Sequence, residues 1–380
     1  MILQDLAGVA GAVCAVAWLY LLLGRGRFWL VKRLQTRVAP AASIGQIAAI
    51  IPARNEADTI GNAVTSLLRQ SCAGSLRIWV VDDNSSDGTA TAAREAAGRN
   101  VHADALTVIA GESLPAGWSG KLWAVQQGIA QALLWQPDFL LFTDADIEHS
   151  PENVATLAAL AQNEDYDLVS FMVKLHCRSL GEKLLIPAFV FLFFLLYPPE
   201  WIRDARRKTA GAAGGCMLLR PEALASAGGI AAIRSEIIDD CALAAAVKGS
   251  GGKVWLGVTP ETHSLRRYES FARIERMIAR TAFNQLQHSA WLLLAAVAGL
   301  TLTFLLPVAL LFSRWWMPAA AAWLLMFVAY LPTVRFYGLN FLWALTLPAS
   351  AIFYMWATLH SAVNYWSGRG GEWKGRAQDR

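Results

Sequence analysis

Short apolar runs alternate with polar and helix-like stretches along the first two thirds of this chain of 380 residues. Runs of strand length occur at 47–51, 76–81, 107–110, 139–144, 167–175, 214–219 and 253–258. The segments between them have a helical spacing of apolar residues and begin with turn-forming or capping residues. Strands that alternate with helices are typical of a parallel sheet with right-handed crossovers. The pattern therefore predicts an α/β fold with a mostly parallel sheet flanked by helices.

Longer apolar runs at both ends of the chain predict helices that span a membrane. The first covers 6–23, and the carboxyl-terminal third contains about three more, near 290–312, 317–334 and 341–366. Five basic residues without an acid follow the first run, and these are Arg25, Arg27, Lys32, Arg33 and Arg37. The positive-inside rule then places the amino terminus outside and the next domain in the cytoplasm. Because the charges follow the run, it is predicted to be an anchor and not a cleaved signal peptide.

The side of the carboxyl terminus stays open. One leading and three trailing spans place it outside, where the basic residues Arg369, Lys374, Arg376 and Arg380 are disfavoured. A re-entrant helix among the last three is the alternative.

The apolar segment over 184–199 is short and bounded by prolines. If it crossed a membrane, it would separate Asp146 from the acidic pair Asp239 and Asp240. We therefore expect it to lie in the membrane interface or to dip into it, beside the basic residues of 203–208. A buried helix of a soluble core is the alternative.

An amphipathic helix is predicted over 264–289, with Arg273, Arg276 and Arg280 on one face. Such a helix suits the cytoplasmic surface of a membrane. The predicted organisation is an amino-terminal membrane anchor over 1–24, a cytoplasmic sheet domain over 40–263, the interfacial helix over 264–289, transmembrane helices over 290–366 and a tail over 367–380.

Composition agrees with a soluble domain joined to membrane segments. Hydrophobic residues make up 55% of the chain and charged residues 16%, which is too apolar for an ordinary soluble protein and too polar for a transporter made only of helices. The five cysteines lack metal-ligand spacing and suit reduced thiols in the cytoplasm. A net charge of +4, concentrated near the membrane segments, suits anionic lipid headgroups, and no sequence pattern points to nucleic acid.

Polar residues stand at the carboxyl ends of three predicted strands, as Arg54 to Glu56, Asp82 with Asp83, and Asp144 with Asp146. In a parallel sheet these ends share the edge where open α/β folds bind ligands, so the three clusters are expected to converge on one cleft. Two carboxylates separated by one small residue can bind Mg²⁺ or Mn²⁺ that also holds a diphosphate. The alternative is a set of acidic turns that cap the following helices.

Four strings follow one another in the order PARNE at 52–56, VVDDNSSDGT at 80–89, DAD at 144–146 and DDCAL at 239–243. This ordered set resembles the motifs of the family 2 glycosyltransferases with the GT-A fold. Longer strings and the membrane segments resemble, more narrowly, the hopene-associated glycosyltransferases of bacterial hopanoid clusters. These strings are GWSGKLWAVQQG at 117–128, DADIEHSP at 144–151, EIIDDCALA at 236–244 and ERMIARTAFNQL at 275–286.

The resemblance implies a metal-dependent, inverting glycosyltransferase in the bacterial inner membrane, multi-pass, with its GT-A catalytic domain in the cytoplasm. It would move one sugar from a nucleotide-sugar, with a UDP-sugar expected, to a lipid acceptor such as a hopanoid. Mg²⁺ or Mn²⁺ is the implied cofactor.

The resemblance also implies the role of each site residue. The implied nucleotide-sugar contacts are Pro52, Arg54, Glu56, Asp82, Asp83, Lys121 and Asp144, with Asp83 on the uracil. The implied metal ligands are Asp144 and Asp146, and the implied acceptor-side residues are Gly214 and Gly215. The implied catalytic acids are Asp239 and Asp240, with Asp240 as the general base. Each has a structural alternative, namely turns and helix caps for the aspartates, a surface ion pair for Arg54 with Glu56, a solvated side chain for Lys121 and close packing for the glycines.

Other functions stay open. Processive members of the family carry a Gln-x-x-Arg-Trp motif, which is missing here although Arg276 and Arg280 lie near the place, so a processive synthase or exporter is disfavoured. A polyprenyl-phosphate glycosyltransferase is the alternative among single-transfer enzymes, with 203–208 as the candidate phosphate site. Intact acids disfavour a non-catalytic scaffold. The histidines His149, His176 and His263 form no ligand-spaced pair and receive no role.

Overall fold

A computed structural model of the chain describes residues 2–31, 44–72, 75–368, 372–373 and 376–377. The chain forms two compact units. A helical unit consists of Met1–Arg33, Cys177–Glu200 and Arg267–Gly371, and a sheet unit consists of Leu34–His176, Trp201–Arg266 and Glu372–Arg380. The predicted domain start at residue 40 lies outside the described residues, as do Lys32, Arg33, Arg37, Arg369, Lys374 and Arg380.

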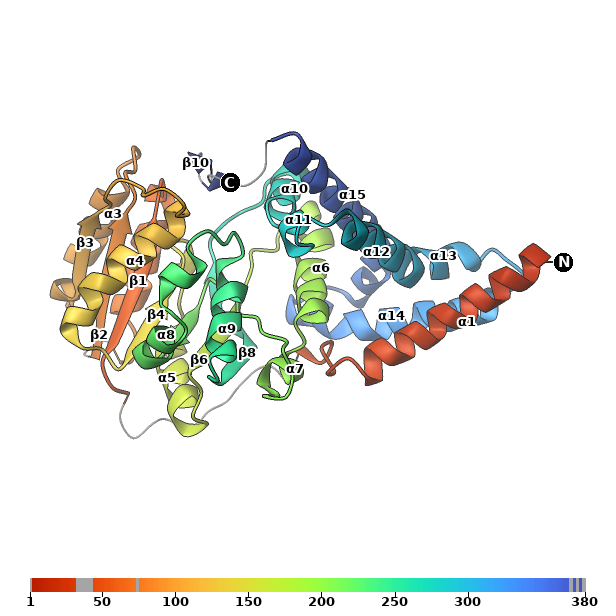
Figure 1. The fold of residues 1–380 in the computed structure, drawn as a ribbon, viewed down its shortest axis with the longest axis horizontal. Helices are drawn as coiled ribbons and strands as arrows, with labels where there is room; N and C mark the ends of the chain where they lie inside the picture. The colour runs from red at the N-terminus through yellow and green to blue at the C-terminus, as the bar shows by residue number, and fades with distance from the viewer. Residues whose placement is uncertain (1, 32–43, 73–74, 369–371, 374–375, 378–380) are drawn as a thin grey trace. The chain divides into compact units, whose positions relative to one another are not determined.

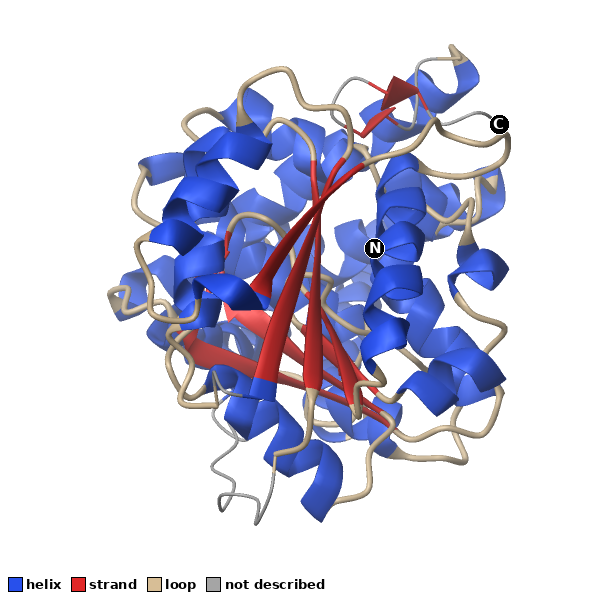
Figure 2. Cartoon of the chain, turned by 90° about the vertical axis from the view of Figure 1, so that its left-hand side faces the viewer, coloured by secondary structure: helices blue, strands red, loops and turns tan. Residues whose placement is uncertain are grey.

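The sheet unit contains a sheet of eight described strands in the order β3-β2-β1-β4-β7-β6-β8-β5, and Figure 2 shows its strong twist. The strands are β1 (Ile47–Ala53), β2 (Leu76–Asp82), β3 (Leu106–Ala110), β4 (Phe139–Phe142), β5 (Ile147–Glu148), β6 (Leu168–Lys174), β7 (Met217–Leu219) and β8 (Val254–Ser264). The first four strands in this order pair in parallel, and so do β6 and β8. β7 is antiparallel to both of its neighbours, and β5 is antiparallel to β8. The predicted α/β fold is confirmed. The short strand β5 was not predicted from the sequence.

Helices cover both faces of this sheet, which explains the unbroken apolar runs of β1 and β4. On one face Ile47 and Ile51 belong to a core shared with α2 (Ala57–Leu68), α3 (Thr89–Gly98) and α5 (Asn153–Asn163). On the other face α4 (Gly120–Ala132) packs against β1 and β2. A Cβ on Gly128 of α4 would lie 2.6 Å from Cγ2 of Ile50, so only glycine lets this helix approach so closely.

Helix α9 (Asp239–Gly249) is held at its carboxyl end by Lys248, a partly buried cation. The Lys248 ammonium lies 2.6–3.2 Å from the carbonyl oxygens of Trp201, Ile202, Asp204 and Thr209. These contacts fix the segment that leads into β7 against the helix that begins with Asp239 and Asp240. Burial lowers the pKa of Lys248.

The helical unit is made of long apolar helices (Figure 1). Its elements are α1 (Ile2–Leu23), α6 (Leu180–Leu196), α10 (Phe271–Ala279), α11 (Ala282–Gln285), α12 (Ala290–Leu300), a π-helical turn over Thr301–Leu305, α13 (Leu306–Leu310), α14 (Trp316–Phe336), a 3₁₀ turn over Phe341–Thr346 and α15 (Leu347–Trp366). Among the described residues, the helices over Leu180–Arg203, Ala290–Leu310, Trp316–Phe336 and Phe341–Trp366 are long and apolar enough to cross a membrane, and Gly8–Leu23 is a shorter apolar helix. The predicted set of one amino-terminal and three carboxyl-terminal apolar helices is confirmed.

Helix α6 corresponds to the apolar segment expected over 184–199. It begins with a capping box between Ser179 and Glu182, and its carbonyls near Pro187 accept hydrogen bonds from α15 at 2.8 and 3.0 Å. The strands β4 and β6 precede α6 in the chain, whereas β7 and β8 follow it, and all four belong to one sheet. A lone membrane crossing by α6 would place paired strands on opposite sides, so α6 does not cross alone.

The single amphipathic helix predicted over 264–289 is wrong in its extent. β8 continues to Ser264, α10 starts only after the capping residue Ser270, and α11 is a separate short helix. The sequence does not predict the strand end after Val258, because residues 259–264 (TPETHS) give neither an apolar run nor an apolar–polar alternation. Within α10 the apolar Ile274 and Ile278 are buried as expected, but Glu275 is buried too and bonds to His360.

Candidate functional site

The carboxyl ends of β1, β2 and β4 lie at one edge of the sheet, because these strands pair in parallel and in register. The clusters around Arg54, Asp83 and Asp144 are therefore neighbours, as the sequence pattern predicts. The amino-terminal turns of α4 and α9 add Lys121, Asp239 and Asp240 to this edge. Together these residues make the candidate site.

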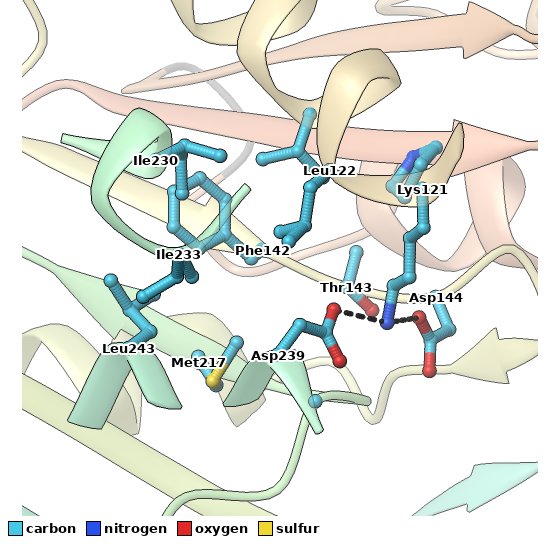
Figure 3. A pocket seen from close by; sticks show the side chains of 13 residues that line it. Lys121, Leu122, Phe142, Thr143, Asp144, Met217, Ile230, Ile233, Asp239 and Leu243 are labelled. Atoms are coloured by element: carbon cyan, nitrogen blue, oxygen red, sulfur yellow. Dashed lines mark ion pairs between the residues drawn. The ribbon is translucent and has the colours of Figure 1, made fainter. Parts of the chain in front are cut away.

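Lys121 joins two of these clusters. The Ser119 side chain caps α4 by accepting a hydrogen bond from the Leu122 backbone N–H, so Lys121 lies in the first turn. Its Nζ is 3.1 Å from Oδ1 of Asp144 and 3.0 Å from Oδ2 of Asp239, as Figure 3 shows. Burial alone would lower the pKa of Lys121, but the two carboxylates outweigh it and raise this pKa. The ammonium therefore stays charged between Asp144 and Asp239.

Asp240 is held by backbone N–H groups. Its Oδ2 accepts from Gly214 at 2.8 Å, and its Oδ1 accepts from Cys241 at 2.7 Å. Burial raises the pKa of Asp240 to about 6, the neighbouring Asp239 adds to the rise, and Lys121 opposes it. A Cβ on Gly214 would lie 3.3 Å from Oδ2 of Asp240, so a side chain there would press on this carboxylate. The N-cap residue of α9 is Ile238, so neither aspartate serves as the cap.

A second cluster consists of Glu56, Asp146 and Arg266. The Arg266 guanidinium donates from Nε to Oδ2 of Asp146 at 2.8 Å and from Nη2 to Oε1 of Glu56 at 2.7 Å. Ser264 adds a hydrogen bond to the same Asp146 oxygen at 3.2 Å. Burial raises the pKa of Asp146, although Arg266 opposes the rise. Arg266 thus links the loop after β1 to the loop after β4.

The remaining predicted residues lie beside these clusters. Arg54 donates from Nη1 to the Asp83 carbonyl at 2.6 Å and lies 3.5 Å from its Oδ2, and Asp83 is buried. Asp82 instead accepts a hydrogen bond from the Ser85 backbone N–H at 3.1 Å, the turn role that was its alternative. Pro52 lines a pocket together with Lys121, Leu122, Val125, Phe142, Thr143, Asp144, Gly214, Met217, Ile230, Ile233, Asp239 and Leu243 (Figure 3). Away from the ion pairs of Lys121, the pocket is lined by apolar side chains, among them Phe142, Ile230 and Leu243.

The donor set suits a divalent cation that is shared with a diphosphate. Within the described part of the chain, no three His, Cys, Asp or Glu side chains cluster closely enough to hold a metal by themselves. Mg²⁺ in nucleotide sites usually takes only one or two carboxylates and completes its shell with phosphate oxygens and water. Asp144 and Asp146 offer such a pair, and Asp144 is partly exposed. The residues therefore fit a divalent metal that completes its coordination with phosphate oxygens and water.

Two polar residues of this site, Arg266 and His149, were not predicted from the sequence. Arg266 lies beyond the predicted end of the last strand, and only the continuation of β8 to Ser264 brings it to the site. His149 received no role, yet it is buried directly behind Thr143 and bonded to it. Neither residue belongs to a recognisable spacing, so the sequence alone gave no signal for them.

Comparisons with known proteins bear on the sheet unit and its fold. Residues 48–227 match the model of the family described as Glycosyl transferase family 2. An uncharacterized protein from Methanocaldococcus jannaschii is 30% identical over 123 residues, which are 32% of this chain and 44% of that relative. The match thus spans less than half the length of this curated relative.

Solved structures are also similar. A mannosyltransferase from Pyrobaculum calidifontis in complex with GDP-Man and Mn²⁺ has a TM-score of 0.52 at 20% identity, over 94% of this chain and 99% of that one. A glucosyl-3-phosphoglycerate synthase from Mycobacterium tuberculosis, in complex with Mg²⁺ and uridine diphosphate, has a TM-score of 0.43 at 18% identity, over 67% and 85%.

The fold and the family match together support a glycosyltransferase with a GT-A-like sheet. The similarity to the glycosyl transferase family 2 model covers residues 48–227 and includes β1, β2 and β4.

We predict that Arg266→Leu lowers the free energy of unfolding of the sheet unit. The substitution removes the guanidinium from two mostly buried carboxylates, whose side chains are 8% and 13% exposed. Because Arg266 itself is 39% exposed, solvent reduces the loss to about 1–3 kcal/mol. Denaturant unfolding of the full chain in detergent measures it.

The matched control is Arg267→Leu at the exposed neighbouring position, which should leave unfolding unchanged. Combining Arg266→Leu with Asp146→Asn and Glu56→Gln should recover most of the loss, because the buried charges are then gone. An Arg266 variant as stable as the Arg267 variant would show that this cluster does not contribute to stability.

Proposed function

We propose that this protein is a membrane-bound, inverting glycosyltransferase that moves a single sugar from a nucleotide-sugar to a lipid acceptor. The observation that carries the proposal is the meeting of Asp144, Lys121, Asp239 and Asp240 at the carboxyl edge of the sheet. Lys121 joins the donor-side carboxylate Asp144 to Asp239, which directly precedes the candidate base Asp240 on α9. A reaction between two substrates needs such a convergence.

The donor side is assigned to the loops after β1, β2 and β4. Asp83, buried and fixed by Arg54, is proposed to accept the base N–H, and Lys121 is proposed to meet the diphosphate as it leaves. Glu56 and Pro52 border this region. A UDP-sugar is the expected donor, and GDP-mannose should be tested beside it because the similar Pyrobaculum mannosyltransferase was solved with GDP-Man.

Asp144 and Asp146 are proposed to hold Mg²⁺ or Mn²⁺, which would neutralise charge on the leaving diphosphate. The similar mannosyltransferase was solved with Mn²⁺. Each carboxylate pairs with its own cation, Asp144 with Lys121 and Asp146 with Arg266.

Asp240 is proposed to act as the general base. It would take the proton from an acceptor hydroxyl while that oxygen forms a bond to the anomeric carbon. The bond from this carbon to the diphosphate oxygen breaks in the same displacement, and the nucleoside diphosphate leaves with the electron pair. One displacement inverts the anomeric centre. A pKa of about 6 leaves Asp240 mostly ionised at neutral pH and still basic enough to accept a proton.

A lipid acceptor is proposed because apolar helices long enough to span a membrane belong to the same chain. A hopanoid is the acceptor that the longer sequence strings favour. The second candidate is a polyprenyl phosphate, for which Arg206 and Arg207 offer exposed guanidinium groups beside Asp204. The inner membrane and a cytoplasmic catalytic face stay part of the proposal, as does transfer of one sugar and not a polymer.

We predict that Asp240→Asn abolishes transfer while nucleotide binding survives. The amide keeps the shape and can still accept the Gly214 hydrogen bond, but it cannot take up a proton. Loss of a well-placed base lowers kcat by about 10²–10⁴-fold. Radiolabelled sugar transfer and calorimetry with the nucleoside diphosphate measure the two effects, and turnover like that of the wild type would remove Asp240 as the base.

Asp146→Ala is the contrasting variant. It should weaken nucleotide binding in the presence of Mn²⁺ far more than binding without the metal, because it removes a proposed metal ligand while Arg266 keeps Glu56 as a partner. Equal affinities of this variant and the wild type in Mn²⁺ would reject the metal role.

We predict that transfer falls as the pH is lowered through about 6. Asp240 must be ionised to accept a proton, and burial has raised its pKa, so the acid limb lies above the range of an ordinary aspartate. The measurement is kcat from pH 5 to 8 at saturating donor and metal, with unfolding checked at each pH. A flat profile across this range would contradict the assignment.

We predict that a deletion strain lacks one glycosylated hopanoid, which returns on complementation with the wild type but not with Asp240→Asn. Lipid mass spectrometry of the three strains tests this. Loss of a polyprenyl-linked sugar in its place would favour the second candidate acceptor.

A further inference from the structure

A buried polar network lies behind the candidate site, outside the residues given a role above. Thr143, His149, Asn153 and Cys216 are all buried, with exposed fractions of 4% or less. The Thr143 Oγ1 lies 2.8 Å from the Gly215 carbonyl oxygen and 2.9 Å from Nε2 of His149. On the other side of the ring, Nδ1 of His149 lies 2.9 Å from Nδ2 of Asn153. The same Asn153 amide lies 3.3 Å from Sγ of Cys216.

The proton positions in this network follow from the donors available. A carbonyl only accepts, so the single hydroxyl proton of Thr143 goes to Gly215. Nε2 of His149 must then carry a proton and donate it to Thr143. Nδ1 accepts from the Asn153 amide, whose second N–H points to Cys216. Each hydrogen-bonding atom therefore acts either as a donor or as an acceptor. A protonated His149 would carry a second N–H at Nδ1, which would face the N–H donor of Asn153 and find no acceptor there.

Burial also favours the uncharged forms of His149 and Cys216. It lowers the pKa of His149 to about 3 and raises the pKa of the Cys216 thiol to about 12. The network is therefore neutral at every pH at which the protein is expected to work.

The two ends of this network are adjacent to the two halves of the candidate site. Thr143 directly precedes Asp144, the proposed donor-side carboxylate. Gly215 directly follows Gly214, whose backbone N–H holds Oδ2 of Asp240 at 2.8 Å. Ser170 of β6 fixes the same turn from below, because its Oγ accepts from the Ala213 backbone N–H at 2.8 Å.

We propose that Thr143 and His149 are positioning residues that set the spacing between Asp144 on the donor side and Asp240 on the acceptor side. This inference rests on the proposed function of those two carboxylates. A shift of about 1 Å in the reacting groups can cost about 10²-fold in rate without weakening binding, so the network is expected to act on kcat.

The first test is Thr143→Val, which keeps the shape but removes both hydroxyl bonds. The expected result is a fall in kcat of about 10²-fold, with the donor KM close to that of the wild type. Thr143→Ser retains the hydroxyl and should restore kcat. The matched control is Thr156→Val, which removes a hydroxyl bond to Glu152 within α5 and should leave both constants unchanged. A Thr143→Val enzyme with the kcat of the wild type, or a Thr143→Ser enzyme as slow as Thr143→Val, would overturn the inference.

The second test needs no transfer activity and uses the wild-type protein labelled with ¹⁵N-histidine. At neutral pH the His149 signals should show a protonated Nε2 and an unprotonated Nδ1, assigned by their loss in His149→Gln. A protonated Nδ1 would overturn the inference even if Thr143→Val does not fold. If the predicted tautomer is seen but the wild type transfers no sugar, the network stands and the proposed function fails.

Discussion

The candidate site depends on compensation of carboxylate charge by cations from other parts of the chain. Two carboxylates 4 Å apart repel by roughly 4 kcal/mol at an effective dielectric constant of 20, so acids gathered at one sheet edge need counter-charges. Arg54 supplies one at Asp83, Lys121 supplies one between Asp144 and Asp239, and Arg266 supplies one between Asp146 and Glu56. In the last two pairings one cation joins acids from two different segments, so charge neutralisation also brings the loops together.

The sheet order explains why this compensation is possible. β4 lies between β1 and β7, so the loop that follows it meets the donor-side loops on one side and the turn before β7 on the other. Helix α9 then brings Asp239 and Asp240 to the same edge. The apolar helix α6 is inserted in the chain between β6 and β7, and the pairing of these strands keeps both of its flanks in one unit. The insertion of α6 therefore does not separate the site residues that precede it in the chain from those that follow it.

The strand ends and their acids could be predicted because they depend on local pattern. An apolar run that stops at a polar residue predicts a buried strand, and parallel pairing predicts that the polar ends meet at one edge. The structure shows both features for β1, β2 and β4. Arg266 could not be found this way, because its partners Asp146 and Glu56 lie 120 and 210 positions earlier in the chain. The end of β8 that leads to Arg266 consists of polar residues and a proline, so the apolar signal of the strand stops at Val258.

His149 escaped prediction for a different reason. A histidine is recognised in a sequence by its spacing to other metal ligands or to a nucleophile, whereas His149 bonds to a threonine and an amide. The proposed role of His149 follows only from the structure, by assigning which of its hydrogen-bond partners donate and which accept. The amphipathic helix over 264–289 was wrong at both ends, because β8 runs to Ser264 and α11 is a separate helix that begins at Ala282. The pattern of arginines lies within or directly after α10 and does not mark these boundaries.

The two links between the donor and acceptor halves differ in kind, and the difference matters for a reaction that moves charge. The Lys121 link is ionic, so an incoming diphosphate competes with Asp144 and Asp239 for the same ammonium. The link through Thr143 and His149 is buried and neutral, and neither a diphosphate nor a cation has reason to displace its partners. In the proposed reaction the ionic link would rearrange around the substrate, while the neutral link would keep Asp144 and Asp240 at a fixed spacing. With one ionic and one neutral link, the same edge of the sheet can exchange ion-pair partners with a charged substrate and still hold its backbone turns in place.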